Sequence, residues 1–481
     1  ADAAWIVACT VEAVRELVYA RAVEVRERVR AIPEQLDRRV GCAGVVAGPA
    51  RALAVIILGI GLTNIYLFHT KGTDTTMLQA SVTYVSALAL SSVYTGFFQL
   101  PFTRFIADRT YENRYYLVLP NFLGMIIFTI FLGIIITTPL GIFIFDTQSN
   151  LFVLLYITLF VVLSCVWIAN ILAASLKLYK LVILFYLLGY ISIYICSLFL
   201  HNYGISGLLI SFIIGNSILF ILLFLGIIRY YPSSNKNNEK FIRFDMFRQN
   251  YGKFYWKLGW SGMLYNIAIW IDKVIFWFSP IVGYVVIDKL HASMVYDFPI
   301  FLAYLSIIPG MAIFFYRLEA DFAQIYAKFY GAINNHGTLS QIKEYKQGMI
   351  DAVKSSIHDV LFVQGMFNIL LFLSAEKLFE LLFLPKLYLP LFYVDVIGVQ
   401  LQLGFMSILA YLYYLDRQKE ALIYTFLFVF VNALLTWVSI QLGPYFYGYG
   451  FSVALLILSV GSVYTLNKIL RELDYETFML Q

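Results

Sequence analysis

The chain has 481 residues, of which 61% are hydrophobic and only 13% are charged, and its mean hydropathy is +0.79. A soluble domain carries about twice that charged fraction, so the composition excludes a soluble protein and indicates helices that face lipid. The net charge of +5 is small and does not indicate a nucleic-acid partner. The four cysteines have no close spacing and no neighbouring His, so we expect neither a disulfide framework nor a metal site.

The first 52 residues differ in composition from the rest of the chain. They contain eight Arg but no Lys and no Phe, whereas the remainder is rich in Lys, Phe, Tyr, Ile and Asn. They also lack the basic start, short apolar stretch and cleavage site of a signal peptide. We interpret 1–45 as a cytoplasmic helical segment, and its foreign composition as the mark of a fused, engineered or misassigned stretch.

Apolar stretches long enough to cross a membrane recur along the rest of the chain. A bilayer core of about 30 Å requires about 20 such residues per helix. Reading between charged or Gly/Pro/Asn-rich breaks predicts twelve spans, at 46–68, 78–102, 118–144, 150–174, 181–200, 204–228, 256–278, 291–316, 357–373, 387–414, 420–440 and 447–467. The predicted fold class is an all-α, polytopic membrane protein with twelve transmembrane helices.

The basic residues of the loops give the orientation. Twenty-nine Lys and Arg lie on the side that holds both termini, and only four lie on the other side. Loops rich in Lys and Arg stay in the cytoplasm. The pattern therefore predicts a protein of the cytoplasmic membrane with both termini in the cytoplasm.

The longest polar gap between spans, 229–255, divides the twelve spans into six and six. We interpret it as a cytoplasmic linker between two pseudo-symmetric six-helix bundles, at 46–228 and 256–467, followed by a cytoplasmic tail at 468–481. Transporters built from two related six-helix halves have this organisation.

An Arg-x-x-Ala-Asp motif recurs at matching places in the two halves. Arg104 and Asp108 lie at the end of the second span, and Arg317 and Asp321 at the end of the eighth, with Glu319 inside the second copy. The shared position favours duplication and predicts that both arginines superpose at the cytoplasmic mouth of a transport path. An Arg that anchors a helix end to lipid phosphates explains each motif equally well.

Residues 317–356 are the one sizeable extramembrane feature. Apolar residues at helical spacing continue the eighth span as an amphipathic helix up to a break at 334–337, and a second amphipathic helix follows. This hairpin either lies on the membrane surface, which physics alone favours slightly, or docks a protein partner. For docking, the candidates are Tyr326 and Tyr330.

Residue types that would carry catalysis are missing. The chain has no Gly-rich phosphate loop, no HExxH motif and no soluble domain with paired carboxylates. We therefore expect no enzyme, no catalytic residue, no metal and no cofactor.

Charged side chains within the predicted spans are more informative, because each costs several kcal/mol in hydrocarbon unless it is paired or hydrated. The seventh span contains Asn266, Trp270, Asp272 and Lys273, and the eighth contains Asp297. Such residues mark a substrate path, or they form a structural ion pair between neighbouring helices. The sequence supports the two interpretations about equally. At 1.5 Å per residue, Lys273 and Asp297 lie at about the same depth on consecutive helices. We therefore expect these two to pair, leaving Asp272 to face the path.

The eighth span also contains Pro299 and Pro309-Gly310. Proline interrupts the hydrogen-bond ladder of a helix and allows a bend. The eighth span is therefore a candidate moving element.

At these same residues the chain resembles the PelG family, the inner-membrane transporters of Pel exopolysaccharide systems, which are relatives of the MATE-like flippases. The stretches that carry the resemblance are 103–109 with 119–121, 264–273, 296–312 (YDFPIFLAYLSIIPGMA) and 319–322. The similarity runs from about residue 78 to the C-terminus. The family's Gly-rich, Phe-containing opening is absent from the N-terminal segment.

The resemblance implies export of an N-acetylgalactosamine-rich polysaccharide, together with a cytoplasmic glycosyltransferase and other membrane proteins of the Pel system, and it favours partner docking for the hairpin. Two alternatives stay open. An ion-gradient-driven flippase of lipid-linked oligosaccharide or small molecules needs an occluded cavity with a titrating carboxylate. A non-conducting membrane scaffold for the synthase needs neither a path nor a carboxylate, and acidic and aromatic lining of a cavity would favour a sugar path.

Overall fold

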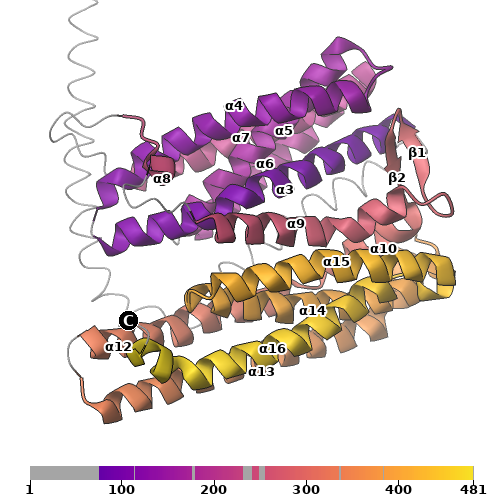
Figure 1. Cartoon of the computed structure of the whole chain (residues 1–481). Helices are drawn as coiled ribbons and strands as arrows, with labels where there is room; N and C mark the ends of the chain where they lie inside the picture. The colour runs from indigo at the N-terminus through magenta and orange to yellow at the C-terminus, as the bar shows by residue number, and fades with distance from the viewer. Residues whose placement is uncertain are drawn as a thin grey trace, which may run out of the picture.

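The computed structural model describes most of the chain after its N-terminal segment. The described residues are 75–112, 114–175, 179–230, 241–248, 255–334, 337–382 and 384–479. They form long helices and one small β-hairpin (Figure 1), so the predicted all-α membrane fold is confirmed. The predicted segment 1–45 and first span 46–68 lie outside the described residues.

The first half of the described chain consists of helices joined by short turns. They are α3 (Thr75–Tyr111), η1 (Tyr115–Leu117), α4 (Val118–Ile144), α5 (Asn150–Ser175), α6 (Tyr179–Leu200), η2 (His201–Tyr203), α7 (Gly204–Tyr230) and α8 (Asp245–Arg248). Helix α8 belongs to the predicted linker and is fastened to the first half, because Asn121 Oδ1 accepts the backbone N–H of Asp245 at 2.7 Å.

The second half contains the β-hairpin and a helical hairpin. Its elements are α9 (Trp256–Trp277), β1 (Tyr284–Ile287), β2 (Leu290–Ala292), α10 (Met294–Leu305), α11 (Ile308–Tyr316), the π-helix η3 (Arg317–Phe322), α12 (Ala323–Asn334), α13 (Leu339–Leu381), η4 (Lys386–Tyr388), α14 (Leu389–Tyr414), α15 (Gln418–Leu442), η5 (Pro444–Phe446) and α16 (Tyr449–Met479). Strands β1 and β2 pair antiparallel.

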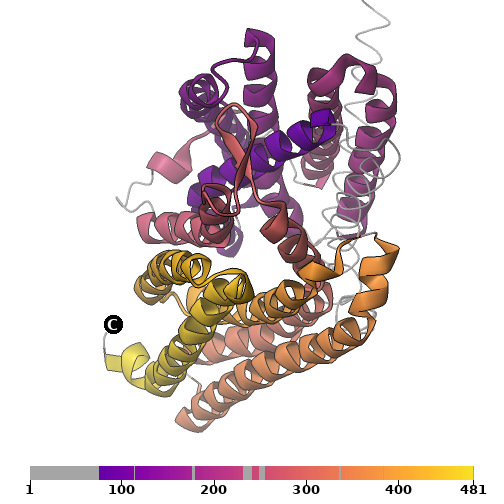
Figure 2. The ribbon, with the colours of Figure 1, turned by 90° about the vertical axis from the view of Figure 1, so that its right-hand side faces the viewer.

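The long helices run between two ends of the molecule. In Figure 1, α3 to α7 form the upper layer, α13 to α16 form the lower layer, and α9 and α10 lie between them. Figure 2 looks onto the end that carries β1 and β2, which we call the β end. The opposite end, which carries α12, is called the α12 end.

The helices agree with the predicted spans from the second span onward. Each span coincides with one long helix, with two exceptions: the eighth, predicted to begin at 291, begins inside strand β2 and continues as the bent pair α10–α11, and the ninth is part of α13. Length and hydropathy identify 8 stretches of the described chain that can cross a membrane, or up to 9 with the bent pair. This count treats α6 and α7 as one stretch and omits the less apolar α9. The chain is thus a multi-pass membrane protein, and twelve spans is an approximate number.

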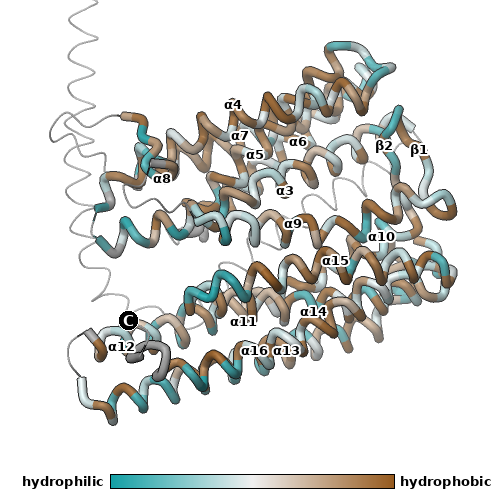
Figure 3. Tube along the Cα trace, in the orientation of Figure 1, coloured by the Kyte–Doolittle hydropathy of each residue, from teal (hydrophilic) through white to brown (hydrophobic). Residues whose placement is uncertain are grey.

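Apolar side chains cover much of the outside of the bundle. In Figure 3 hydrophobic residues dominate the middle of the helices, while hydrophilic residues collect at the turns. Large apolar side chains such as Phe131, Leu373 and Val460 are exposed. Exposure of this kind over many helices is what a surface in contact with lipid requires.

Helix α9 joins the two halves. It packs along α3 of the first half and along α15 of the second. At its crossing with α3 the backbones approach closely, because a Cβ atom added to Gly262 would lie only 2.4 Å from the carbonyl oxygen of Gly96. Small residues allow such close helix packing in membranes.

The predicted bend of the eighth span is confirmed. Helices α10 and α11 meet at 42°, just before Pro309. The side chain of Gln364 on α13 satisfies the backbone groups that the break leaves free, since its Nε2 donates to the Ser306 carbonyl oxygen at 2.8 Å and its Oε1 accepts the Gly310 N–H at 3.1 Å. Gln364 is fully buried, so the bend is fixed by a specific contact.

The predicted helical hairpin is also present, as α12 and the first part of α13. The second helix starts with a capping box, in which the Thr338 hydroxyl accepts the Gln341 N–H and the Gln341 side chain accepts the Thr338 N–H. It then continues without interruption for 43 residues. The second amphipathic helix and the ninth span are therefore one helix.

A buried charged cluster in the second half

Buried charges lie in the second half, where α9 and α10 contact each other and α14 packs against α10. Asp272 on α9 is fully buried, and its Oδ2 accepts hydrogen bonds from Lys273 Nζ at 3.0 Å and from the Tyr296 hydroxyl at 2.6 Å. Lys273 is also buried and donates to the carbonyl oxygen of Ile269 at 2.9 Å. The ion pair is therefore held within one helix, and Tyr296 of α10 completes it.

Aromatic rings surround the ammonium of Lys273. Its Nζ lies 5.1 Å from the ring centre of Tyr304, 5.6 Å from that of Phe451 and 6.0 Å from that of Trp270. The faces of aromatic rings attract cations, most strongly where water is absent. These contacts connect the charge on α9 to α10 and α16.

The predicted pair between Lys273 and Asp297 is wrong. Instead, the single indole N–H of Trp277 is shared between the two carboxylate oxygens of Asp297, at 2.8 and 3.0 Å, and the backbone N–H of Ser293 donates to Asp297 at 3.0 Å. The expectation rested on the matching depth of Lys273 and Asp297 on consecutive helices. The four-carbon stem of Lys273 is long enough to fold back, so its ammonium reaches Asp272, one residue earlier.

A second buried carboxylate was missed in the sequence. Asp395 on α14 is fully buried and lies close enough to Lys273 and Asp272 to interact with both electrostatically. Among the described residues, neither of its carboxylate oxygens has a hydrogen-bond partner. The sequence did contain a signal for this carboxylate, because Asp395 is an acidic residue inside a predicted apolar span.

Further polar groups lie near Asp395. The hydroxyls of Tyr265 and Tyr304 both face the side chain of Gln402, and Tyr304 lies close enough to Asp395 to interact with it electrostatically. Buried polar groups normally have a partner, so the carboxylate of Asp395, which has none among the described residues, indicates a place for water, an ion or a ligand. We call Asp272, Lys273, Asp395 and their neighbours Tyr296 and Tyr304 the buried charged cluster.

The cluster contains two carboxylates and one ammonium. Of these two acids, Lys273 bonds directly only to Asp272, so its charge neutralises one of them. A second buried carboxylate is costly as an isolated anion, and a bound proton or cation removes that cost. Asp395 is therefore the acid of the cluster whose charge no direct ion pair neutralises among the described residues.

Two other predicted path residues lie at the crossing of α9 with α3. Trp270 donates its indole N–H to the Ser92 hydroxyl of α3 at 3.1 Å. Asn266 donates to the carbonyl oxygen of Gly262 at 3.0 Å, and its amide lies beside Gly96. Trp270 therefore connects α9 to the first half by a hydrogen bond and also reaches Lys273 of the cluster, whereas Asn266 only packs against α3 at Gly96.

The two Arg-x-x-Ala-Asp motifs form the same local ion pair. Arg104 Nε lies 3.2 Å from Asp108 Oδ1, and Arg317 Nη1 lies 2.5 Å from Asp321 Oδ2. Arg317 also pairs with Asp359 of α13. Any helix with this spacing can form such a pair, so the equivalence of the motifs in the two halves stays a prediction.

The remaining residues around these motifs lie at the α12 end. The Tyr255 hydroxyl donates to Asp108 Oδ2 at 2.8 Å, and the Arg104 guanidinium lies over the Tyr255 ring at 5.9 Å. Glu319 is half-buried within η3. These contacts join the end of α3 to the start of α9, remote along the helices from the buried charged cluster.

The predicted docking residues Tyr326 and Tyr330 are half-buried. Their rings lie 4.6 Å apart, and the Tyr326 ring lies 6.1 Å from that of Tyr414 on α14. The pair therefore packs α12 onto the second half. The exposed side chains of the hairpin include Lys328 of α12 and Lys343 of α13.

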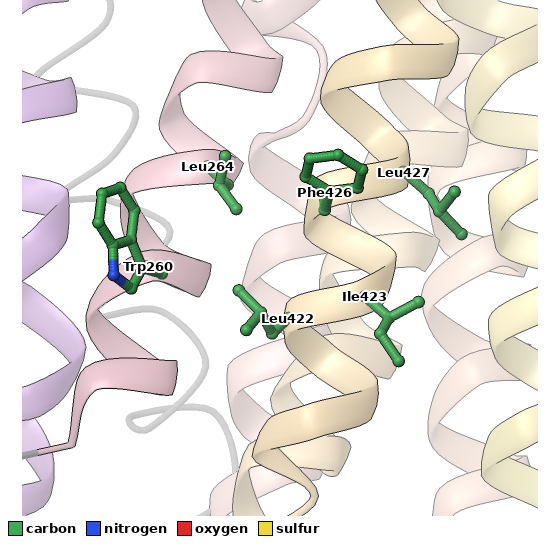
Figure 4. Close-up of a pocket in the computed structure, with 6 residues that line it drawn as sticks. All are labelled: Trp260, Leu264, Leu422, Ile423, Phe426 and Leu427. Carbon is green, nitrogen blue, oxygen red and sulfur yellow. The ribbon is translucent and has the colours of Figure 1, made fainter.

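A pocket between α9 and α15 is apolar, unlike the buried charged cluster. It has a volume of about 320 Å³ and is lined only by apolar parts of Trp260, Leu264, Leu422, Ile423, Phe426 and Leu427 (Figure 4). A sugar needs hydrogen-bond partners as well as aromatic faces. This pocket therefore does not suit a polysaccharide.

Comparison with known proteins gives one family and a group of similar folds. A family model described as "PelG: Putative exopolysaccharide Exporter (EPS-E)" matches residues 40–478. No curated protein sequence matches the chain. The family match begins near the end of the compositionally different N-terminal segment.

Several solved MATE transporters have a similar fold. A mutant of a Vibrio cholerae MATE transporter has a TM-score of 0.61 at 12% identity, covering 90% of this chain and 98% of the other. An outward-facing multidrug resistance MATE transporter has a TM-score of 0.59 at 11% identity, covering 91% and 98%. A MOP superfamily transporter from Pyrococcus furiosus has a TM-score of 0.59 at 11% identity, covering 91% and 97%. At these identities the similarity is one of fold.

Proposed function

Because the chain belongs to the PelG family of exopolysaccharide exporters, we propose that it carries an exopolysaccharide from the cytoplasm across the cytoplasmic membrane. The observation that carries the proposal is the family match, which extends over nearly all of the described chain. The MATE-like fold supports it, since it is a fold of transporters. We further propose a Pel-like, N-acetylgalactosamine-rich polymer as the substrate.

The orientation is part of the proposal. The α12 end carries the helical hairpin and the basic loops, so we place it in the cytoplasm together with both termini. The β end then faces the extracytoplasmic side. A polymer would enter at the α12 end, near Arg104 and Arg317, and leave at the β end.

Export is tested by deletion and complementation. In a strain that makes the polymer, removal of this protein is expected to lower extracellular polysaccharide at least tenfold, while the glycosyltransferase still consumes its sugar nucleotide in membranes. Complementation with the full chain should restore export. Continued export without the protein would contradict the proposal, whereas loss of export together with loss of synthesis would favour the scaffold alternative.

We propose that the glycosyltransferase docks at the α12 end, on the exposed face of the helical hairpin. The supporting observation is a set of exposed basic side chains on α12 and the start of α13, including Lys328, Lys343 and Lys354. Tyr326 and Tyr330 would contribute indirectly, because their packing holds α12 against α14 and so positions the exposed face. Other membrane proteins of the system are further candidate partners.

Reversing the charge of this face is expected to weaken docking. The double change Lys328→Glu with Lys343→Glu should lower co-purification of the glycosyltransferase at least fivefold, because opposite charges guide and hold protein partners. Membrane insertion should be unchanged, since both side chains are exposed. The matched control is Lys419→Glu, an exposed lysine at the start of α15 and outside the hairpin. Equal recovery with all variants would return the hairpin to a role at the membrane surface.

A second candidate function is flipping of a smaller sugar substrate, driven by an ion gradient. The observation that favours it is the buried charged cluster, in which Asp395 has no partner among the described residues. Transport coupled to protons or cations would stop when an ionophore collapses the gradient, and it would fail in Asp395→Asn. Polymer export driven by synthesis alone would continue under both conditions.

A further inference from the structure

The β-hairpin formed by β1 and β2 belongs by sequence to the second half, between α9 and α10, but it lies against the first half. Figure 2 places it across the start of α3. Ile287 and Leu290, on either side of its turn, are buried in the apolar cluster that fills the β end of the first half. The hairpin therefore connects the two halves at the β end.

Polar contacts at the turn strengthen this connection. The Lys289 ammonium lies 2.9 Å from Asp146 Oδ2, donates to the Phe143 carbonyl oxygen at 2.9 Å, and lies over the Phe143 ring at 4.3 Å. Asp288, the other turn residue, accepts hydrogen bonds from the side chains of Thr147 and Gln148. All of these partners lie at the end of α4 or in the loop that follows it.

A further contact fixes the strand itself. Gln79, near the start of α3, donates its side-chain N–H to the Val286 carbonyl oxygen of β1 at 3.1 Å. Asp288 adopts a positive φ of 48°, a conformation that Asp tolerates better than most residues. The turn thus presents Asp288 and Lys289 together to the α4–α5 loop.

The base of the hairpin is held rigidly to the second half. The Ser293 hydroxyl donates to the Val282 carbonyl oxygen at 3.1 Å, which closes the hairpin at its base. Asp297 accepts N–H groups from both Ser293 and Trp277, so it clamps this base to α9 and α10. The hairpin must therefore move with the second half, while its tip is attached to the first.

The tip contacts are suited to release. The side chains of Lys289 and Asp146 are 44% and 51% exposed, and ion pairs at such sites contribute little stability each because water competes for both groups. The Lys289 hydrogen bond holds the pKa of Asp146 below its usual range, so the pair stays charged at neutral pH. The polar contacts of the tip are therefore weak one by one, and release also requires that Ile287 and Leu290 leave the apolar cluster of the first half.

We propose that the β1–β2 hairpin is an intramolecular latch, in which Asp288 and Lys289 hold the two halves together at the β end and must release the α4–α5 loop before substrate can leave. The latch itself follows from contacts within the chain. Its role in releasing substrate rests on the proposed export function and on the β end being extracytoplasmic.

Spin labels test the latch without any substrate. Labels placed at the exposed positions Ile142 on α4 and Val285 on β1 should give a short, narrow distance distribution in the otherwise wild-type protein in nanodiscs. The double change Asp288→Ala with Lys289→Ala should add a longer distance that accounts for at least half of the molecules. The matched control is Lys386→Ala, an exposed lysine at the same end whose partner is Glu380 of the same half. An unchanged distribution would overturn the latch.

A reversible cross-link tests the role in export. Asp146→Cys with Lys289→Cys, in a chain whose native cysteines are replaced, should lose export at least tenfold on oxidation and regain it on reduction, whereas neither single cysteine should respond. Full cross-linking with undiminished export would overturn the substrate-release role. If the reduced protein and the wild type both fail to export, the proposed function falls, while the spin-label result still decides whether the latch exists.

Discussion

Replacing Lys273 by Met is expected to destabilise the protein by about 3–5 kcal/mol, the cost of removing one partner of a buried ion pair. Lys273 is the ammonium that faces both Asp272 and Asp395. Without it, two carboxylates are left in the interior with no positive charge. Thermal unfolding in detergent should show a lower Tm, and export should fall with it. Lys257→Met is the matched control, because Lys257 is exposed on the same helix.

The buried pair also predicts a partial rescue. The double change Lys273→Met with Asp272→Asn removes the charge of both partners, and Tyr296 can still donate to the remaining side-chain oxygen. It should recover a large part of the lost Tm. The double change of Lys273→Met with Asp297→Asn should recover none, because Asp297 is bonded to Trp277 and Ser293. If the Asp297→Asn double change recovered Tm and the Asp272→Asn double change did not, the result would support the Lys273–Asp297 pair predicted from the sequence.

Replacing Gly262 by Ala is expected to destabilise the protein by a comparable amount, through steric overlap rather than through an unpaired charge. The new Cβ would lie 2.4 Å from the carbonyl oxygen of Gly96, and this neighbour is backbone, so α3 and α9 must separate. Overpacking costs about 1–3 kcal/mol, and we expect the upper end of this range because separation also breaks the hydrogen bond from Trp270 to Ser92. Monodispersity in size-exclusion chromatography and Tm in nanodiscs measure the loss.

Gly461→Ala is the matched control for this prediction. Gly461 lies in α16, where an added Cβ would meet the Tyr424 ring at 3.5 Å, an ordinary contact. It should change Tm by a small fraction of the Gly262→Ala effect. If the two variants lose equal stability, the close approach of α3 and α9 is not what makes Gly262 necessary.

The sequence predicted the helices well because hydropathy acts over about 20 residues and tolerates local errors. The bend at Pro309 and the break before Thr338 were also predictable, since proline and an Asn–Gly cluster disrupt helices for local reasons. The joining of the second amphipathic helix to the ninth span was not predicted. No proline separates them, and a change from amphipathic to apolar pattern alone does not end a helix.

The charged site was harder to predict, because pairing depends on side-chain reach and on neighbours distant in sequence. Depth along the helix matched Lys273 to Asp297, but depth does not say which way a flexible lysine turns. Asp395 was overlooked although it is an acid within an apolar span. The β-hairpin was overlooked because its run of β-branched residues, within 284–287, lies in a loop between spans and is short.

The uninterrupted α13 has a mechanical consequence. At 1.5 Å per residue, its 43 residues make a rod about 65 Å long, roughly twice the thickness of the hydrocarbon core. About half of it must therefore stand outside the lipid, and a continuous helix of this kind has no joint at the membrane boundary. An enzyme bound to the outer part would be held at a fixed height and angle above the bilayer, so its product would emerge at a constant position relative to the entrance of the bundle.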